Sequence, residues 1–208
     1  MSIFLGNGLN IVCDGNSITA GYSSGTTNSN SSYPSQMKLF LTKLGITATV
    51  TNIGVGGQTT LNMILDSASI DTLIVPGAQN ILIASEGAND FFFNNSTVQA
   101  TYDRFISYCL NRMSAGWYVI VFSNLNRINA PTWGTSADLE VKVSAFNSML
   151  EANYKNFCSR YVDIRRALPM LVPGSEYMPD NVHPSNTGYA LMGVTLAREV
   201  SLLRRKGV

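Results

Sequence analysis

The chain contains a single imidazole, His183, and its neighbours could use it to activate a hydroxyl group. Imidazole is the side chain best suited to general-base chemistry at neutral pH. Asp180 lies three residues before His183. A carboxylate at that spacing could bond one ring nitrogen, fix the tautomer and stabilise the imidazolium ion. The question is therefore which hydroxyl group this imidazole serves.

Ser17 is the strongest candidate for that hydroxyl group. It ends the segment 14–17, Asp-Gly-Asn-Ser, which follows the apolar run Leu9–Cys13. A serine is a weak nucleophile until a base within hydrogen-bond reach removes its proton. Taken alone, a serine in a turn rich in Asx residues is more often part of the turn than a nucleophile. The assignment therefore depends on the elements that position the two ends of the chain.

Apolar segments typical of strands alternate along the chain with amphipathic segments typical of helices. The expected strands are 9–13, 46–53, 80–85, 117–123 and 160–164, and the expected helices are 34–44, 97–114, 136–157 and about 185–205. This alternation predicts an α/β fold, a three-layer α/β/α sandwich around a mainly parallel five-stranded sheet. Pro34 and Gly45 mark the ends of the first helix, and Ser136 is a candidate cap for the third. No repeat or linker divides the chain, so residues 1–208 are expected to form one domain.

Polar residues gather where four of these five strands end. Besides Ser17, they are the glycine-rich segment 54–59, the segment 86–90, and Asp180 with His183. Ligands of an open parallel sheet bind outside the carboxyl ends of its strands. We therefore expect these loops to form one site. Each loop alone has an ordinary explanation as a strand–helix turn or a helix cap; Asp90, for example, is expected to cap a helix.

Taken in order, the four loops resemble the motifs of the SGNH, or GDSL-type, hydrolase family. The matches are Gly15-Asn16-Ser17, where the family usually has Gly-Asp-Ser; Gly57; Gly87-Ala88-Asn89-Asp90, matching Gly-x-Asn-Asp; and Asp180-x-x-His183-Pro184. The resemblance spans residues 12–184 and implies a flavodoxin-like SGNH hydrolase fold. Asn16 departs from the family pattern, but this position does not supply the acid of the triad.

The resemblance also implies roles for individual residues. Ser17, His183 and Asp180 would be the nucleophile, the base and the orienting acid of a catalytic triad. The oxyanion hole would consist of the backbone N–H groups of Ser17 and Gly57 and the side-chain amide of Asn89. A second serine motif, Gly-x-Ser-x-Gly at 21–25, is not expected to be a nucleophile elbow, because no strand immediately precedes it and a polar surface loop, residues 23–32, follows it.

Composition narrows the expected partners. The net charge of +1 offers no field that would recruit nucleic acid or an anionic membrane. Three cysteines without CxxC spacing and a single histidine predict neither a disulfide framework nor a zinc site. We expect no metal and no cofactor, and a small-molecule or glycan ester as the only partner. The segment before Asp14 lacks the basic residues of a signal peptide, and the compartment and the oligomeric state stay open.

The resemblance implies hydrolysis of esters or thioesters, and the residues near the expected site favour a carbohydrate ester. The polar loop 23–32 and the aromatic residues Tyr22, Phe91 and Trp133 would suit a sugar ring and a short acyl group. We therefore expect a carboxylic-ester hydrolase that removes small O-acyl groups, such as acetyl, from a carbohydrate. Phe91 could equally belong to the core, and Trp133 could only pack on the following helix. The alternatives are a short-chain thioesterase or lysophospholipase, or a catalytically silent glycan-binding domain.

Overall fold

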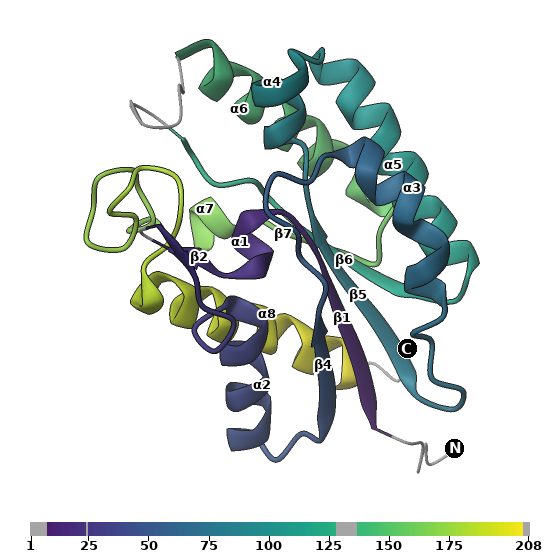
Figure 1. Cartoon of the computed structure of the whole chain (residues 1–208). Coiled ribbons are helices and arrows are strands. Elements are labelled where there is room, and N and C mark those ends of the chain that lie inside the picture. Colours follow the sequence, from purple (N-terminus) through teal and green to yellow (C-terminus); the bar gives the residue numbers. More distant parts are fainter. Residues whose placement is uncertain (1–7, 24, 128–136, 206–208) are drawn as a thin grey trace.

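The computed structural model describes residues 8–23, 25–127 and 137–205, and its central element is one five-stranded sheet (Figure 1). All five strands are parallel, in the order β4-β1-β5-β6-β7. Their bounds are β1 (Leu9–Gly15), β4 (Ala48–Asn52), β5 (Gln79–Ser85), β6 (Tyr118–Phe122) and β7 (Arg160–Val162). The five predicted strands and the parallel sheet are confirmed. The strand order reverses between β1 and β5, which is where ligands of such sheets bind.

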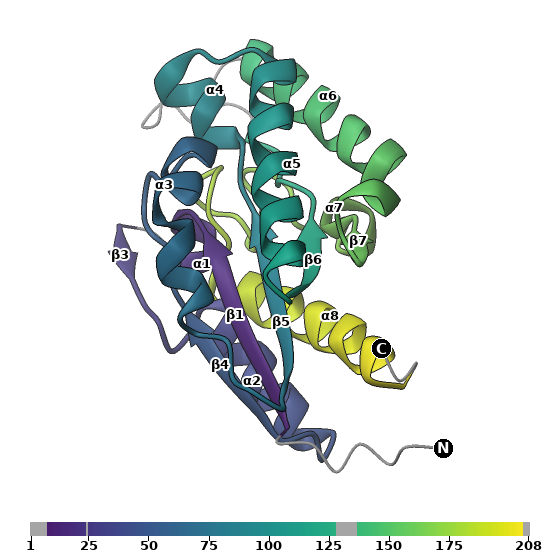
Figure 2. The same ribbon diagram turned by 90° about the vertical axis from the view of Figure 1, so that its right-hand side faces the viewer.

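Helices cover both faces of the sheet, as predicted (Figures 1 and 2). On one face lie α2 (Tyr33–Lys43) and α8 (Asn186–Arg205), and on the other lie α3 (Thr60–Asp71), α5 (Val98–Ser114) and α6 (Ala137–Asn153). The central strands β1, β5 and β6 contain continuous apolar runs because alternate side chains enter opposite cores. Ile11 and Ile83 pack with α2 and α8, whereas Val12 and Leu82 pack with the other helices. None of the described helices is long and apolar enough to cross a membrane.

Several short elements were not predicted. They are α1 (Ser17–Ala20), the hairpin of β2 (Tyr22–Ser23) with β3 (Thr26–Thr27), α4 (Ala88–Asn94), α7 (Ile164–Ala167) and a 3₁₀ turn (Tyr154–Asn156). The longer helix α3 was not predicted either. The hairpin lies in the segment expected to be a polar loop. In α3, Thr59 and Asn62 form a capping box with Asn in place of the usual Glu or Gln, so the sequence signal for the start of this helix is weak. The predicted cap Ser136 lies outside the described residues.

Candidate active site

The structure brings Ser17, His183 and Asp180 into one hydrogen-bonded chain. The Oγ atom of Ser17 lies 3.0 Å from Nε2 of His183, and Nδ1 of His183 lies 2.8 Å from Oδ2 of Asp180. An ionised carboxylate can only accept, so Nδ1 carries the proton and donates it to Asp180. Nε2 is then the acceptor, and the hydroxyl group of Ser17 donates to it. This is the arrangement in which an imidazole can remove a proton from serine.

Local backbone geometry places Ser17 at the carboxyl end of β1. Gly15 has a φ of 149°, and a Cβ atom added there would lie 2.6 Å from the carbonyl oxygen of Ser85 on the neighbouring strand. Only glycine fits this close approach. The next residue, Asn16, caps α1, because its Oδ1 accepts a hydrogen bond from the backbone N–H of Ile18 at 3.0 Å. Ser17 is therefore the first residue of a short, capped helix.

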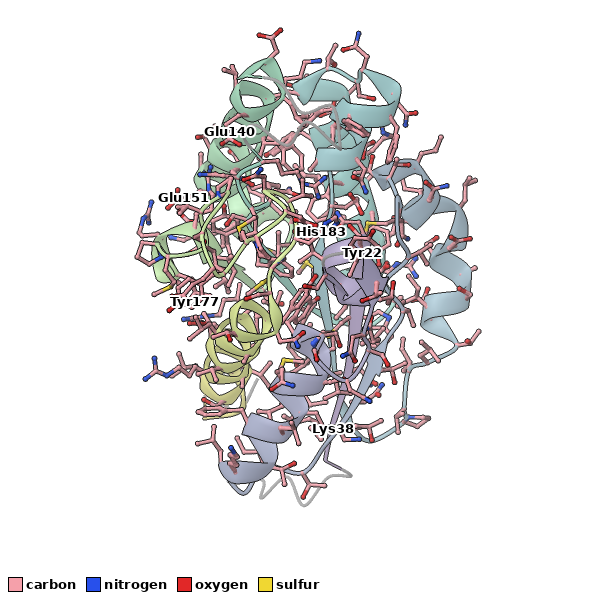
Figure 3. The ribbon with its side chains drawn as sticks, turned by 60° about the vertical axis from the view of Figure 1, so that its left-hand side comes forward. Tyr22, Lys38, Glu140, Glu151, Tyr177 and His183 are labelled. Carbon is pink, nitrogen blue, oxygen red and sulfur yellow. The ribbon has the colours of Figure 1, made fainter. Side chains whose placement is uncertain are left out.

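The carboxylate of Asp180 also fixes the backbone of the loop that carries Asp180 and His183. Oδ1 of Asp180 accepts backbone hydrogen bonds from Val182 at 2.9 Å and from His183 at 2.6 Å, which leaves Oδ2 for the imidazole. The ring of Tyr22 lies beside the imidazole, with ring centroids 4.5 Å apart (Figure 3). Tyr189, on α8, holds Tyr22 in place by donating from its hydroxyl group to the Tyr22 carbonyl oxygen at 2.6 Å. The imidazole is thus fixed on two sides.

The protonation states of the pair suit general-base chemistry. Burial lowers the pKa of His183 below its ordinary value; the carboxylate of Asp180 opposes this shift, and the positive charge of Arg127 adds to it. For Asp180, burial acts to raise the pKa, but hydrogen bonds from His183 and Val182 prevail, so its pKa lies below the usual range. At neutral pH the imidazole is therefore neutral and the carboxylate is charged.

Gly57 and Asn89 lie on the same cavity as Ser17 and His183. Gly57 has a φ of 77°, a conformation that L side chains rarely adopt. The side-chain nitrogen of Asn89 donates to the carbonyl oxygen of Gln58 at 2.8 Å, which ties the two loops together. Asp90 strengthens this tie: it accepts from the backbone N–H of Thr60 at 2.9 Å, at the start of α3. Asp90 therefore caps a helix, as expected, but a different helix from α4 in which it lies.

The cavity above these residues is small and mostly apolar. Its volume is about 200 Å³, and it is lined by Ser17, Tyr22, Gly56, Gly57, Asn89, Phe92, Phe93, Arg127, Val182 and His183. Tyr22 is thus on the cavity, as expected. Phe91 is not: it is buried against Phe146, with ring centroids 5.8 Å apart. The expectation for Phe91 is corrected, because the turn of α4 directs Phe91 into the core and Phe92 and Phe93 towards the cavity. Trp133 lies outside the described residues.

Glu86 gives a physical reason for Asn16 at a position where the resembled family usually has Asp. The side-chain nitrogen of Asn16 donates to Oε1 of Glu86 at 3.0 Å, and both side chains are buried. Burial raises the pKa of Glu86 to about 8. An aspartate at position 16 has no N–H group and could not donate to Oε1 of Glu86. The amide of Asn16 supplies this donor and also accepts the cap hydrogen bond of α1.

Arg127 is the site residue that the sequence interpretation did not include. It follows β6, the one predicted strand whose end was not assigned to the site, and its side chain is only 5% exposed. It lines the cavity and donates from Nη1 to Oδ1 of Asn89 at 3.1 Å. Its position in the chain was therefore a usable signal: every other strand of the sheet core delivers a polar residue to this edge, and β6 should do so too.

Comparisons with known proteins agree with this architecture. The sequence profile of the GDSL-like lipase/acylhydrolase family matches residues 13–191. Among solved structures, a carbohydrate acetylesterase family member from Sinorhizobium meliloti is 17% identical, with a TM-score of 0.71 over 93% of this chain and 98% of that one. A lipase/acylhydrolase from Enterococcus faecalis is 21% identical, with a TM-score of 0.71 over 92% and 95%. A lipolytic G-D-S-L family protein from Veillonella parvula is 20% identical, with a TM-score of 0.68 over 89% and 94%. No curated protein matches the chain.

Proposed function

Because the chain belongs to the GDSL-like lipase/acylhydrolase family, whose members hydrolyse ester bonds, we propose that it is a serine carboxylic-ester hydrolase with Ser17 as nucleophile, His183 as general base and Asp180 as the orienting acid. The observation that carries this proposal is the chain of contacts from Ser17 to His183 at 3.0 Å and from His183 to Asp180 at 2.8 Å. A binding domain has no need of a neutral imidazole held between a serine and a carboxylate.

In the first half of the reaction, Oγ of Ser17 attacks the ester carbonyl carbon while its proton passes to Nε2 of His183. The carbonyl oxygen becomes an oxyanion, which the backbone N–H groups of Ser17 and Gly57 and the amide of Asn89 would bind. The tetrahedral intermediate then collapses: the bond to the alcohol oxygen breaks, and that oxygen takes the proton from His183. The alcohol leaves, and the acyl group remains bound to Ser17 as an ester.

In the second half, a water molecule takes the place of the alcohol. His183 removes a proton from the water as its oxygen attacks the acyl carbon. The second tetrahedral intermediate occupies the same oxyanion site, and its collapse breaks the bond to Ser17, whose Oγ takes the proton back from His183. A carboxylic acid is released and the enzyme is regenerated. Asp180 stays ionised throughout and stabilises the imidazolium ion that forms twice in each cycle.

A fluorophosphonate probe tests the assignment of the nucleophile directly. Oγ of an activated serine attacks the phosphorus atom, fluoride leaves, and a stable phosphonyl adduct forms. We expect one adduct per chain by intact mass spectrometry, and peptide mapping should place it on Ser17. Ser23, the serine of the Gly-x-Ser-x-Gly motif, serves as an internal control and should stay unmodified. Absence of an adduct, or an adduct on another serine, would refute the proposed mechanism.

For the substrate, the cavity favours a short acyl group. About 200 Å³ is below the ~300–1,000 Å³ usual for drug-sized ligands, and Phe92, Phe93 and Val182 make its walls apolar. The similar fold of a carbohydrate acetylesterase family member and the polar hairpin beside Tyr22 support an acetylated carbohydrate. The acyl group would occupy the apolar cavity and the sugar would lie at its open side. We propose small O-acyl groups on a carbohydrate as the substrate class.

A substrate panel tests this choice of acyl group and alcohol. The panel compares kcat/KM for acetylated sugars, p-nitrophenyl esters of increasing chain length and an acyl-CoA. We expect the value to fall by at least about tenfold between acetyl and octanoyl esters, because overfilling a packed cavity costs ~1–3 kcal/mol. Acetylated sugars should be cleaved faster than the thioester. A preference for long chains or for acyl-CoA would replace the carbohydrate-ester proposal with the lipase or thioesterase alternative.

The dependence of activity on pH follows from the lowered pKa of His183. Only the neutral imidazole can accept the proton of Ser17, so kcat/KM should rise with pH as His183 loses its proton and then level off. Because the pKa of His183 lies below its ordinary value of 6.5, the midpoint of this rise should lie below pH 6.5. NMR titration of the single histidine should give the same midpoint. A rate that does not change while the imidazole titrates would exclude His183 as the base.

A further inference from the structure

Arg127 is a buried cation in direct contact with the proposed oxyanion hole. Its side chain is 5% exposed, and it lines the cavity together with Ser17, Asn89 and His183. Arginine is almost never this deeply buried unless it has a partner. Its one side-chain hydrogen bond within the described residues runs from Nη1 to Oδ1 of Asn89 at 3.1 Å. The described part of the chain thus gives this long, charged side chain one hydrogen-bond acceptor, the amide oxygen of Asn89.

This contact acts together with the hydrogen bond to Gln58 to set which way the amide of Asn89 faces. A guanidinium group has only donors, so the Asn89 atom that it bonds must be the carbonyl oxygen. The amide nitrogen then points away from Arg127, where one of its two hydrogens bonds the carbonyl oxygen of Gln58 at 2.8 Å. The second hydrogen forms no bond within the described residues. It is available to an oxyanion on the carbon attacked by Ser17. Without Arg127, the bond to Gln58 alone would oppose rotation of the amide by half a turn within the described residues. Such a rotation would present an oxygen to that oxyanion and repel it.

The guanidinium group of Arg127 forms no salt bridge within the described residues, although Asp180 and Glu140 act on its charge from nearby and Oε2 of Glu140 accepts from the backbone N–H of Arg127 at 3.0 Å. Its Nε and Nη2 atoms, and Oε2 of Glu86, are all buried without a hydrogen-bond partner in the described part of the chain. Burial raises the pKa of Glu86 to about 8, so this carboxyl group is mostly protonated at neutral pH. Burial lowers the pKa of Arg127 below its ordinary value, because a buried cation with unpaired donors is unfavourable in the resting enzyme. A negative oxygen atom forming on the other side of Asn89 would offset that cost.

We propose that Arg127 is a positioning residue, which holds the Asn89 amide with its free N–H directed at the oxyanion. This proposal rests on the proposed esterase function and adds a residue to it. Arg127 acts through Asn89 and does not itself contact the reacting atoms. The orientation of the amide matters only once the carbonyl oxygen becomes negative, so Arg127 should affect kcat much more than KM.

A double-mutant cycle between Arg127 and Asn89 tests the proposal. With p-nitrophenyl acetate as substrate, Arg127→Met should lower kcat by about 10²-fold, as loss of one oxyanion donor does, and change KM by less than about threefold. In a chain that already carries Asn89→Ala, Arg127→Met should lower kcat by no more than about threefold further, because the amide it holds is gone. Equal losses in the two backgrounds, or a normal kcat for Arg127→Met, would overturn the proposal.

Two further variants separate positioning from a general effect on folding. Arg166→Met removes an arginine that is exposed and paired with Glu151, and it should leave kcat unchanged. Arg127→Lys keeps a charged donor and should recover at least about tenfold of the loss in kcat. If Arg127→Met does not fold, the same cycle is run with Arg127→Lys. Its loss of kcat should again be smaller in the Asn89→Ala background than in the original chain. Failure of the proposed esterase function would give a different result: Ser17→Ala would turn over the ester as fast as the original chain, whatever residue stands at position 127.

Discussion

Ser17→Ala is expected to lower kcat for a short acetyl ester by about 10⁶-fold, the loss typical of removing the nucleophile of a serine triad. The variant keeps the cavity, the oxyanion donors and His183, but it has no atom that can form the acyl ester. Its fold should be unchanged, because the hydroxyl group of Ser17 hydrogen-bonds only to the imidazole within the described part of the chain. The measurement is kcat with p-nitrophenyl acetate, alongside the thermal unfolding midpoint.

Ser23→Ala is the matched control for this variant. Ser23 lies on β2, in the Gly-x-Ser-x-Gly motif, six residues beyond Ser17. Its replacement should leave kcat within about threefold of the original value. A chain carrying both Ser17→Ala and His183→Ala should be no slower than Ser17→Ala alone, because the two residues act as one unit. Substantial activity in Ser17→Ala would end the case for a serine mechanism.

Asp180→Asn should lower kcat by about 10⁴-fold while leaving the loop in place. The substituted side chain retains an oxygen for the backbone N–H groups of Val182 and His183, which Oδ1 now accepts at 2.9 and 2.6 Å. Its nitrogen then replaces Oδ2 beside Nδ1 of His183. Two donors cannot face each other, so Nδ1 must lose its proton and Nε2 must carry it. An Nε2–H group cannot accept the proton of Ser17.

The NMR spectrum of His183 tests this prediction directly, because it reports which ring nitrogen carries the proton. Nitrogen chemical shifts of His183 should show the proton on Nδ1 in the unmodified enzyme and on Nε2 in Asp180→Asn. Asp103→Asn, at an exposed position on α5, is the control and should alter neither the tautomer nor kcat. If Asp180→Asn retains high activity with the original tautomer, Asp180 does not orient the base.

The sheet and its long helices could be predicted because their signals are local. Continuous apolar runs predicted the central strands, and Pro34 and Gly45 predicted the ends of α2. The one-turn helices α1 and α7 could not be predicted, because one turn gives no periodicity. Capping by Asn62 in place of Glu or Gln hid the start of α3. For these elements, the neighbouring structure decides the conformation.

The candidate site was predictable where polar motif residues lie in the loops after strands, as with Ser17, Asn89 and His183. It was not predictable where only burial marks a residue. The position of Arg127 after β6 indicates that it lies near this edge of the sheet, but nothing in the sequence indicates that its side chain is enclosed. The order of Phe91, Phe92 and Phe93 is likewise uninformative, because these residues are identical in type. The rotation of about 100° per residue in α4 assigns one to the core and two to the cavity.

The contact between Ser17 and His183 joins residues 166 positions apart, and this has a consequence for synthesis on the ribosome. Ser17, in α1, is synthesised before His183, and at ~5–20 residues per second the imidazole follows many seconds later. Helix α8, which packs on α2 and holds Tyr22 through Tyr189, follows His183 in the sequence. A growing polypeptide therefore has no imidazole to deprotonate Ser17 until His183 has been synthesised, and under the proposed mechanism it cannot cleave esters before that point.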